Sequence, residues 1–203
     1  LEIKPSQQTE RLRKLITAAQ MIQSHAGHAF FVSLVSDKLT KESRALLELR
    51  EFALKIIEMI GGRRVHPMTP IVGGFTKIPE KQAYKKVLKY WSKTYESALA
   101  LLDYFKKLEY PKLKREALFC SSYSEGDYPH HKGKMIKIGD RVFSPGDFFS
   151  NQIEEDLKNP PSKRVEFQGR SYMLGAIARI KNNGNNLDLE AKTELQEFRN
   201  KNS

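Results

Sequence analysis

Apolar residues recur at helical spacing through the first part of the chain. The polar segment 6–10 is typical of a helix start, and an apolar stripe follows it at spacings of three and four residues. The stripe comprises Leu12, Leu15, Ile16, Ala19, Ile22, Ala26, Phe30 and Leu34. The opposite face of residues 16–35 is also largely apolar, which predicts a helix buried on all sides. Because 203 residues supply few covering layers, we expect neighbouring chain to be missing and the isolated chain to self-associate.

Two further helices are predicted before residue 110. One spans 41–60 and stops at the Gly61-Gly62 pair, and the other begins near Pro79 and continues to about Leu108. Aromatic and aliphatic residues line one face of the third helix, and we interpret them as core packing. Residues 61–78 join the second helix to the third, and loops of this length are usually functional or disordered.

The pattern changes after Pro111. Short strands are predicted at 118–123, 135–138, 141–143, 164–167 and 171–174, with turns at Gly139-Asp140 and Gln168-Gly169. A short helix is expected over 148–157, a flexible break over 182–186, and a charged helix from Asp188 to about Arg199. We therefore divide the chain into a helical portion (1–110), a β-rich insertion (111–181), and a linker with a C-terminal helix (182–203).

Composition narrows the choice of class. With 39% hydrophobic and 29% charged residues the chain can bury a core, and no apolar run is long enough to span a membrane. The net charge of +11 is concentrated in residues 61–135, which hold 15 basic and 7 acidic side chains, a difference of +8. Cys120 is the only cysteine, so no internal disulfide or thiolate cluster can form, and a reducing cytoplasm is the expected compartment.

Few residues look catalytic. His25 and His28 are three residues apart, but two ligands do not make a metal site, and we expect buried, hydrogen-bonded imidazoles. His130-His131 is expected at the surface, and the acidic run 154–156 on a solvated helix end. The glycine pairs of the 61–78 loop lack the strand-then-helix context of a phosphate-binding loop. The residues alone do not identify an enzyme.

Three stretches, in order, resemble the large subunit of the [NiFe] hydrogenases, and most closely the cytosolic branch that reduces NAD(P), F420 or sulfur. Residues 18–31 are similar to the family's helix with a Ser-His-x-x-His pattern before an aromatic pair. Residues 64–67 and 73–77 are similar to its His-Pro and Gly-Gly loop. Residues 172–179 are similar to its Tyr-x-x-Gly-Pro-x-Ala-Arg segment, with Ala176 in place of the proline.

The resemblance implies a mainly α fold of long packed helices with a small β-rich insertion. It implies a parent oxidoreductase that interconverts H2 with protons and electrons at a nickel–iron centre. The family holds that centre with two Cys-x-x-Cys pairs, which this chain lacks, so we expect a middle segment with no cofactor or catalytic residue, inactive alone. We expect it to supply scaffold and an interface with the iron–sulfur small subunit. His66, Pro67, Gly73 and Gly74 are the candidate residues, near the small subunit's proximal cluster.

Two alternatives differ in class. A metal-free relative, such as the quinone-site subunit of respiratory complex I, would share the fold and lack the cysteines, but the Ser-His-x-x-His helix argues against it. A basic helical nucleic-acid-binding module would account for the charge of residues 61–135. Those lysines alternate with an apolar helix face, as solvated lysines do, so we expect no nucleic-acid partner.

Overall fold

The computed structural model describes residues 3–33, 40–110, 116–150, 153–156 and 164–201. The chain forms two compact units, which divide between Leu108 and Glu109. The first unit contains four helices and a two-stranded hairpin, and the second contains a six-stranded sheet with three short helices. Leu34 and Val35, predicted at the end of the first helix, lie outside the described residues.

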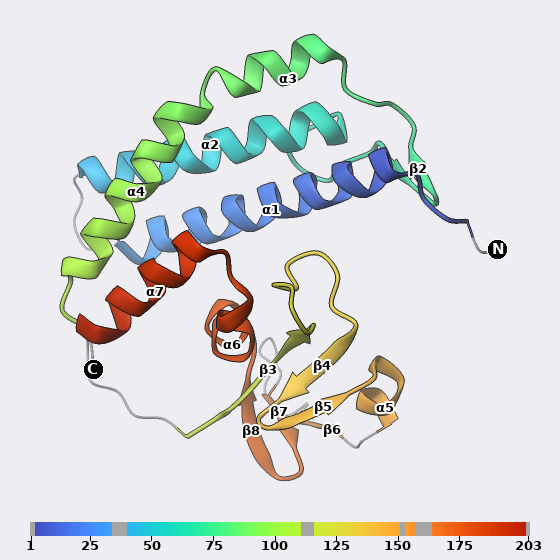
Figure 1. Ribbon diagram of the computed structural model, residues 1–203, viewed down its shortest axis with the longest axis vertical. Helices are drawn as coiled ribbons and strands as arrows, with labels where there is room; N and C mark the ends of the chain where they lie inside the picture. Colours follow the sequence, from blue (N-terminus) through green and yellow to red (C-terminus); the bar gives the residue numbers. More distant parts are fainter. Residues whose placement is uncertain (1–2, 34–39, 111–115, 151–152, 157–163, 202–203) are drawn as a thin grey trace. The chain divides into compact units, whose positions relative to one another are not determined.

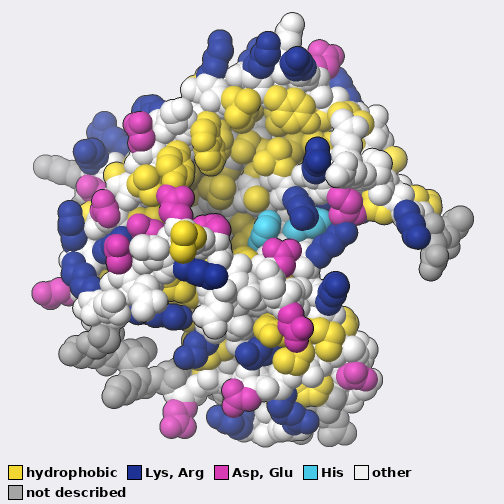
Figure 2. Space-filling view, viewed as in Figure 1, with side chains coloured by type: hydrophobic (Ala, Val, Ile, Leu, Met, Phe, Trp, Pro, Cys, Tyr) yellow, Lys and Arg dark blue, Asp and Glu magenta, His cyan; other side chains and the backbone are white. Residues whose placement is uncertain are grey.

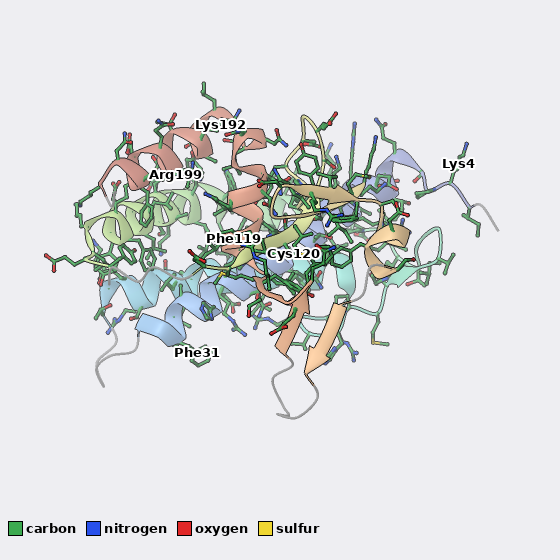
Figure 3. All side chains as sticks on the ribbon, turned by 90° about the horizontal axis from the view of Figure 1, so that it is seen from below. Lys4, Phe31, Phe119, Cys120, Lys192 and Arg199 are labelled. Carbon is green, nitrogen blue, oxygen red and sulfur yellow. The ribbon has the colours of Figure 1, made fainter. Side chains whose placement is uncertain are left out.

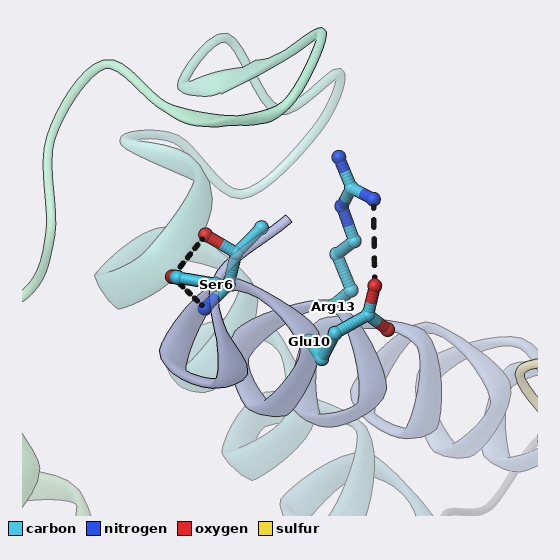
Figure 4. A network of polar contacts seen from close by, with 4 residues as sticks. Ser6, Glu10 and Arg13 are labelled. Carbon is cyan, nitrogen blue, oxygen red and sulfur yellow. Dashed lines mark hydrogen bonds and ion pairs between the residues drawn. The ribbon is translucent and has the colours of Figure 1, made fainter. Parts of the chain in front are cut away.

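The first helix, α1 (Gln7–Ser33), begins at a serine cap. The backbone N–H of Thr9 donates to Ser6 Oγ at 3.2 Å, and this satisfies one of the free N–H groups of the first turn. One turn further on, a Glu10 carboxylate oxygen lies 3.9 Å from the Arg13 guanidinium (Figure 4). The polar segment that predicts a helix start is therefore the cap itself.

The second helix, α2 (Lys41–Gly61), runs antiparallel to α1 and beside it (Figure 1). Thr40 caps its start, since its Oγ1 accepts the backbone N–H of Ser43 at 3.1 Å. Gly62 ends it in the left-handed conformation (φ 80°), where its N–H donates to the Glu58 carbonyl. The stop predicted at the glycine pair is confirmed.

The core of the first unit lies between α1 and α2. Its buried side chains come from one face of each helix: Leu12, Ile16, Ala19, Phe52, Ala53, Leu54, Ile56, Ile57 and Ile60. The expected burial of α1 on all sides is wrong, because Leu15 is 36% exposed and Phe31 is 74% exposed. Phe31 projects away from the end of α1 (Figure 3). One partner helix covers one face only, so the remaining apolar residues of α1 stay accessible.

The single helix predicted over 79–108 is instead two helices, α3 (Lys81–Leu88) and α4 (Trp91–Lys107). At the break, the N–H of Tyr90 donates to the Val87 carbonyl at 3.0 Å, a tighter bond than the α-helical one. The break places the Tyr90 ring beneath the Lys55 ammonium, 3.8 Å from the ring centroid. Contacts with α2 therefore accompany the bend, and helical periodicity alone does not reveal it.

The second unit is built on a mixed sheet with strand order β5-β4-β3-β8-β7-β6 (Figure 1). Only β3 and β8 pair in parallel, and the other neighbours are antiparallel. The strands are β3 (Leu118–Tyr123), β4 (Met135–Ile138), β5 (Arg141–Phe143), β6 (Ile153–Asp156), β7 (Arg164–Phe167) and β8 (Arg170–Met173). Both predicted turns connect antiparallel strands: residues 139 and 140 join β4 to β5, and residues 168 and 169 join β7 to β8.

Aromatic packing closes this sheet on one side. Phe148 comes from α5 (Pro145–Ser150), and its ring stacks on that of Phe167 with 6.4 Å between centroids. Cys120 and Ile138 complete the buried cluster. The helix predicted over 148–157 is wrong: α5 ends at Ser150, and residues 153–156 form β6, paired with β7. The acidic run therefore lies on a strand, and Leu157 is outside the described residues.

The asparagine-rich segment predicted as a flexible break is ordered. Asn182 and Asn183 end α6 (Ala176–Asn183), and Asn186 ends the short 3₁₀ turn η1 (Gly184–Asn186) before α7 (Leu189–Lys201). Asn183 is 1% exposed, and its Nδ2 donates to the Ser122 carbonyl at 3.0 Å. These side-chain amides attach the helical segment to β3, so the segment is part of the fold.

The fold prediction is thus confirmed in part. Long packed helices make up the first unit, as expected. The second unit contains a six-stranded mixed sheet, which is more than a small insertion in a mainly α fold. No helix within the described residues is long and apolar enough to cross a membrane.

Candidate functional site

The loop 61–78 is tied to the end of α2. The N–H of Met68 donates to the Gly61 carbonyl at 2.8 Å, and Thr69 Oγ1 donates to the Ile60 carbonyl at 2.6 Å. These bonds satisfy carbonyls that a helix end leaves without partners. A further bond, from the N–H of Thr76 to the Thr69 carbonyl at 2.8 Å, closes the loop on itself. The loop is a fixed structure on the surface of the first unit.

His66 has an unusual backbone in this loop. Its φ is 52°, and among the described residues only Gln168 is another non-glycine residue with a positive φ. Left-handed conformations cost an L-residue free energy and persist where the surroundings impose them. Here the carbonyl of His66 accepts from Arg63 Nε at 2.5 Å, while Arg64 pairs with Glu51 of α2. The imidazole itself is exposed.

Pro67 explains how the His-Pro step is held. A Cβ built on Gly61 would lie 2.6 Å from Pro67 Cβ, closer than real Cβ contacts. Only glycine therefore lets Pro67 pack this closely against the end of α2. The proline ring fixes the chain direction directly after His66. Gly61 and Pro67 together position the exposed imidazole.

The second glycine pair belongs to a small hairpin. β1 (Pro70–Ile71) pairs with β2 (Gly74–Phe75), and Ile71 is opposite Gly74. Gly73 has a φ of 83°, which the tight turn requires. The four candidate residues thus lie on one anchored loop, His66 and Pro67 beside the α2 end and Gly73 and Gly74 in the hairpin.

Sequence reasoning missed the apolar residues of the same loop. Four of them are at least half exposed: Val65 (61%), Met68 (67%), Ile71 (50%) and Val72 (83%). They are interspersed with basic side chains, and residues 61–79 contain no acidic one. The signal was available, because apolar residues without periodicity in a long loop have no helix or strand face to bury them. An exposed apolar cluster of this kind is typical of a binding surface.

The histidine pair of α1 does not form a buried site. His25 and His28 are both exposed, so the expectation of buried imidazoles is wrong. They flank Gly27, which is buried and packs near the Arg50 side chain. His130 is exposed, as expected. Within the described parts of the chain, no group of three or more histidine, cysteine or carboxylate side chains could hold a metal ion.

The segment 172–179 forms the junction between β8 and α6. Gly175 takes a φ of 100°, and its carbonyl accepts the N–H of Arg179 at 3.0 Å. Ala176, which replaces the proline of the related pattern, is the first residue of α6. Proline is favoured at this position because the N–H there has no helical partner. Alanine also starts a helix well, so the replacement is compatible with the observed junction.

Cys120 does not behave as a metal ligand. It is 3% exposed on β3, in the core of the second unit (Figure 3). Burial raises the pKa of its thiol to about 11, so the neutral form prevails at neutral pH, whereas a metal needs the thiolate. A nickel–iron centre held by thiolates does not fit the residues of this chain, and the expectation of a small apolar residue at position 120 is confirmed.

Comparison with known proteins identifies the relatives. No protein-family model matches the chain. The alpha subunit of sulfhydrogenase 1 from Pyrococcus furiosus is 28% identical over 210 residues, covering 95% of this chain. A subunit of the F420-non-reducing hydrogenase vhu from Methanocaldococcus jannaschii is 28% identical, covering 84%. The chain is homologous to hydrogenase alpha subunits.

The fold agrees with this relationship. A crystal structure of an NAD+-reducing [NiFe]-hydrogenase superposes with a TM-score of 0.74 at 18% identity, covering 97% of this chain. The chain spans about half the length of the hydrogenase subunits it matches, namely 48% of the sulfhydrogenase protein and 49% of the vhu protein. These relatives are hydrogenase subunits, and they favour neither the complex I nor the nucleic-acid-binding alternative.

Proposed function

We propose that the chain is part of the large subunit of a nickel–iron hydrogenase whose parent enzyme interconverts H2 with protons and electrons. The observation that carries this proposal is the match to the sulfhydrogenase protein over 95% of the chain. The relatives are about twice as long, so the nickel–iron ligands would come from parts of the parent that this chain does not span. A cytoplasmic parent belongs to the same proposal, as does its electron acceptor class of NAD(P), F420 or sulfur.

In this proposal the segment supplies scaffold and one contact with the iron–sulfur small subunit. The contact is the loop 61–78, and its anchoring to α2 supports the role because a fixed surface loses little entropy on binding. The exposed apolar residues Met68 and Val72 would bury area against the partner. The absence of acidic residues in the loop would favour an acidic partner surface.

Each candidate residue has a separate task in that contact. The exposed imidazole of His66 can donate a hydrogen bond to cluster sulfur, and such bonds raise a cluster's reduction potential. Pro67 holds the backbone that presents it. Gly73 and Gly74 have no side chain beyond the backbone, so the partner can approach the hairpin closely. When bound in the parent, the nickel–iron centre supplies the splitting of H2, and none of these residues takes part in that step.

Binding to the small subunit tests the proposal. The purified chain would be titrated with the small subunit encoded in the same genome, carrying its clusters. We expect a complex that Val72→Glu weakens by at least about tenfold, because a charge would enter the apolar contact. Leu189→Glu is the matched control, since Leu189 is 81% exposed on α7 of the other unit. No complex, or equal weakening by both variants, would contradict the proposal.

His66→Ala gives the second readout of the same complex. We expect the variant still to bind, while the midpoint potential of the proximal cluster becomes more negative, because one hydrogen bond to the cluster is lost. An unchanged potential would remove His66 from the contact even if the loop binds. Self-association of the isolated chain stays a prediction, and sedimentation of the unliganded chain would measure it in the same experiment.

A further inference from the structure

A second apolar surface lies on α4, in the same unit. Its residues recur at spacings of four, three and four along the helix: Trp91, Tyr95, Ala98 and Leu102. We call these four residues the α4 stripe. Trp91 is 50% exposed, Tyr95 37% and Leu102 43%, and the adjoining Leu88 of α3 is 64% exposed. Sequence analysis interpreted the aromatic residues of this face as core packing, and that interpretation is wrong.

The stripe is exposed because α4 uses other residues to reach the core. Thr94 and Leu101 are its buried residues. Trp91 only edges toward α2, with its ring centroid 6.0 Å from that of Phe52, and it stacks on Tyr95 at 5.6 Å. Figure 2 shows apolar side chains gathered along α3 and α4, with lysine and arginine at the outer rim. The two stacked rings form a ready contact surface.

The spacing of the stripe indicates what shape fits it. Alternating steps of three and four residues place apolar side chains on one seam, which is the geometry by which two helices pack side by side. Tryptophan and tyrosine are the residues that most often dominate binding energy at such contacts. A second helix, with its own apolar seam, is the occupant that this geometry favours.

The charge beside the stripe indicates the character of that helix. Residues 81–93 contain five lysines and no acidic residue. Lys85 and Lys89 are exposed, whereas Lys93 pairs with Glu48 at 3.4 Å. Two copies of this segment would bring lysines together, so like-charge repulsion disfavours self-pairing here. An acidic helix would instead be attracted.

We propose that the α4 stripe binds an amphipathic helix with an apolar seam and acidic flanks. In one respect this inference rests on the proposed function: the helix would come from the half of the large subunit that this chain does not span. The matched hydrogenase structure supports that source, because the chain covers 97% of its own length but only 51% of that protein. The missing half of the subunit must cover apolar surface somewhere on this unit.

Trp91 makes the proposal directly measurable, since it is the chain's only tryptophan. The probe is a synthetic helical peptide of the length of α4, with leucine at the seam positions and glutamate on the flanks. We expect binding to move Trp91 emission to shorter wavelength and to protect it from acrylamide quenching. Leu88→Glu and Tyr95→Glu should each weaken binding by about tenfold, with circular dichroism confirming that they fold.

Three controls separate the features that the proposal combines. The same peptide with lysine in place of glutamate tests charge, and a scrambled peptide of equal composition tests the seam, and we expect neither to bind. Leu189→Glu should leave binding of the acidic peptide unchanged. Equal binding of the lysine peptide, or no binding of the acidic one, would overturn the proposal.

Two other outcomes would also overturn it by naming another occupant. Phosphatidylserine vesicles that shift Trp91 emission more than the peptide would assign the stripe to a membrane surface. A shift that depends on chain concentration without peptide would assign it to a second copy. The small-subunit titration remains an independent test, because it uses the loop 61–78, so either proposal can fail while the other holds.

Discussion

Replacing His66 with glycine tests whether the loop 61–78 holds its backbone under strain. The left-handed conformation at φ 52° costs an L-residue about 1–2 kcal/mol, toward the lower end for histidine. Glycine adopts it freely but loses about 0.5–1 kcal/mol through the greater entropy of the unfolded chain. We therefore expect His66→Gly to stabilise the protein by about 0.5–1 kcal/mol. His66→Ala keeps the strain and removes an exposed side chain, so it should change stability by less than about 0.5 kcal/mol.

Urea unfolding followed by Trp91 fluorescence would measure both variants. Because Trp91 lies in the same unit as the loop, its signal reports the unfolding of that unit. The expected order of stability is glycine variant first, with the wild type and the alanine variant equal. A loss of several kcal/mol in His66→Ala would show that the imidazole belongs to a buried network. A loss in His66→Gly would show that the surroundings do not impose the left-handed backbone. Either result would refute this account of the loop.

Three further predictions concern other parts of the chain. Asn183→Ala should destabilise the second unit by about 2–3 kcal/mol in thermal unfolding, because buried acceptors lose their donor, while exposed Asn185→Ala should change it by less than about 0.5. The raised pKa of the Cys120 thiol means that only the unfolded state ionises between pH 9 and about 11, so stability should fall as pH rises through this window. Cys120→Ala should lack that component, and a fall of equal size in both proteins would refute the assignment. Elemental analysis of the purified chain should find no stoichiometric nickel or iron, and about one nickel per chain would show that other residues form a metal site.

Much of the secondary structure follows from local patterns. The strands predicted at 118–123, 135–138 and 141–143 are β3, β4 and β5 with the same bounds. Short β-branched and aromatic runs between turn residues specify such strands locally. The end of α2 is equally local, since Gly62 can take the left-handed cap that other residues resist. These features depend on a few neighbouring residues, which the sequence displays.

The remaining features depend on partners distant in sequence. Periodicity reveals that Trp91 and Tyr95 share an apolar face, but not whether another layer covers that face. Asn183 is typical of a loop until the carbonyl of Ser122, some 60 residues earlier, is seen to need a donor. His66 could be selected through resemblance, whereas its positive φ arises from the packing of Pro67 on Gly61. Tertiary contacts decided each of these cases.

The central claim is that the chain belongs to the large subunit of a nickel–iron hydrogenase. The direct measurement is to isolate from its source the native polypeptide that contains this sequence, and to determine its peptide map and nickel content together. We expect a longer polypeptide with a Cys-x-x-Cys pair on each side of these residues and about one nickel per chain. A native polypeptide that lacks those cysteine pairs and carries no nickel would contradict the claim.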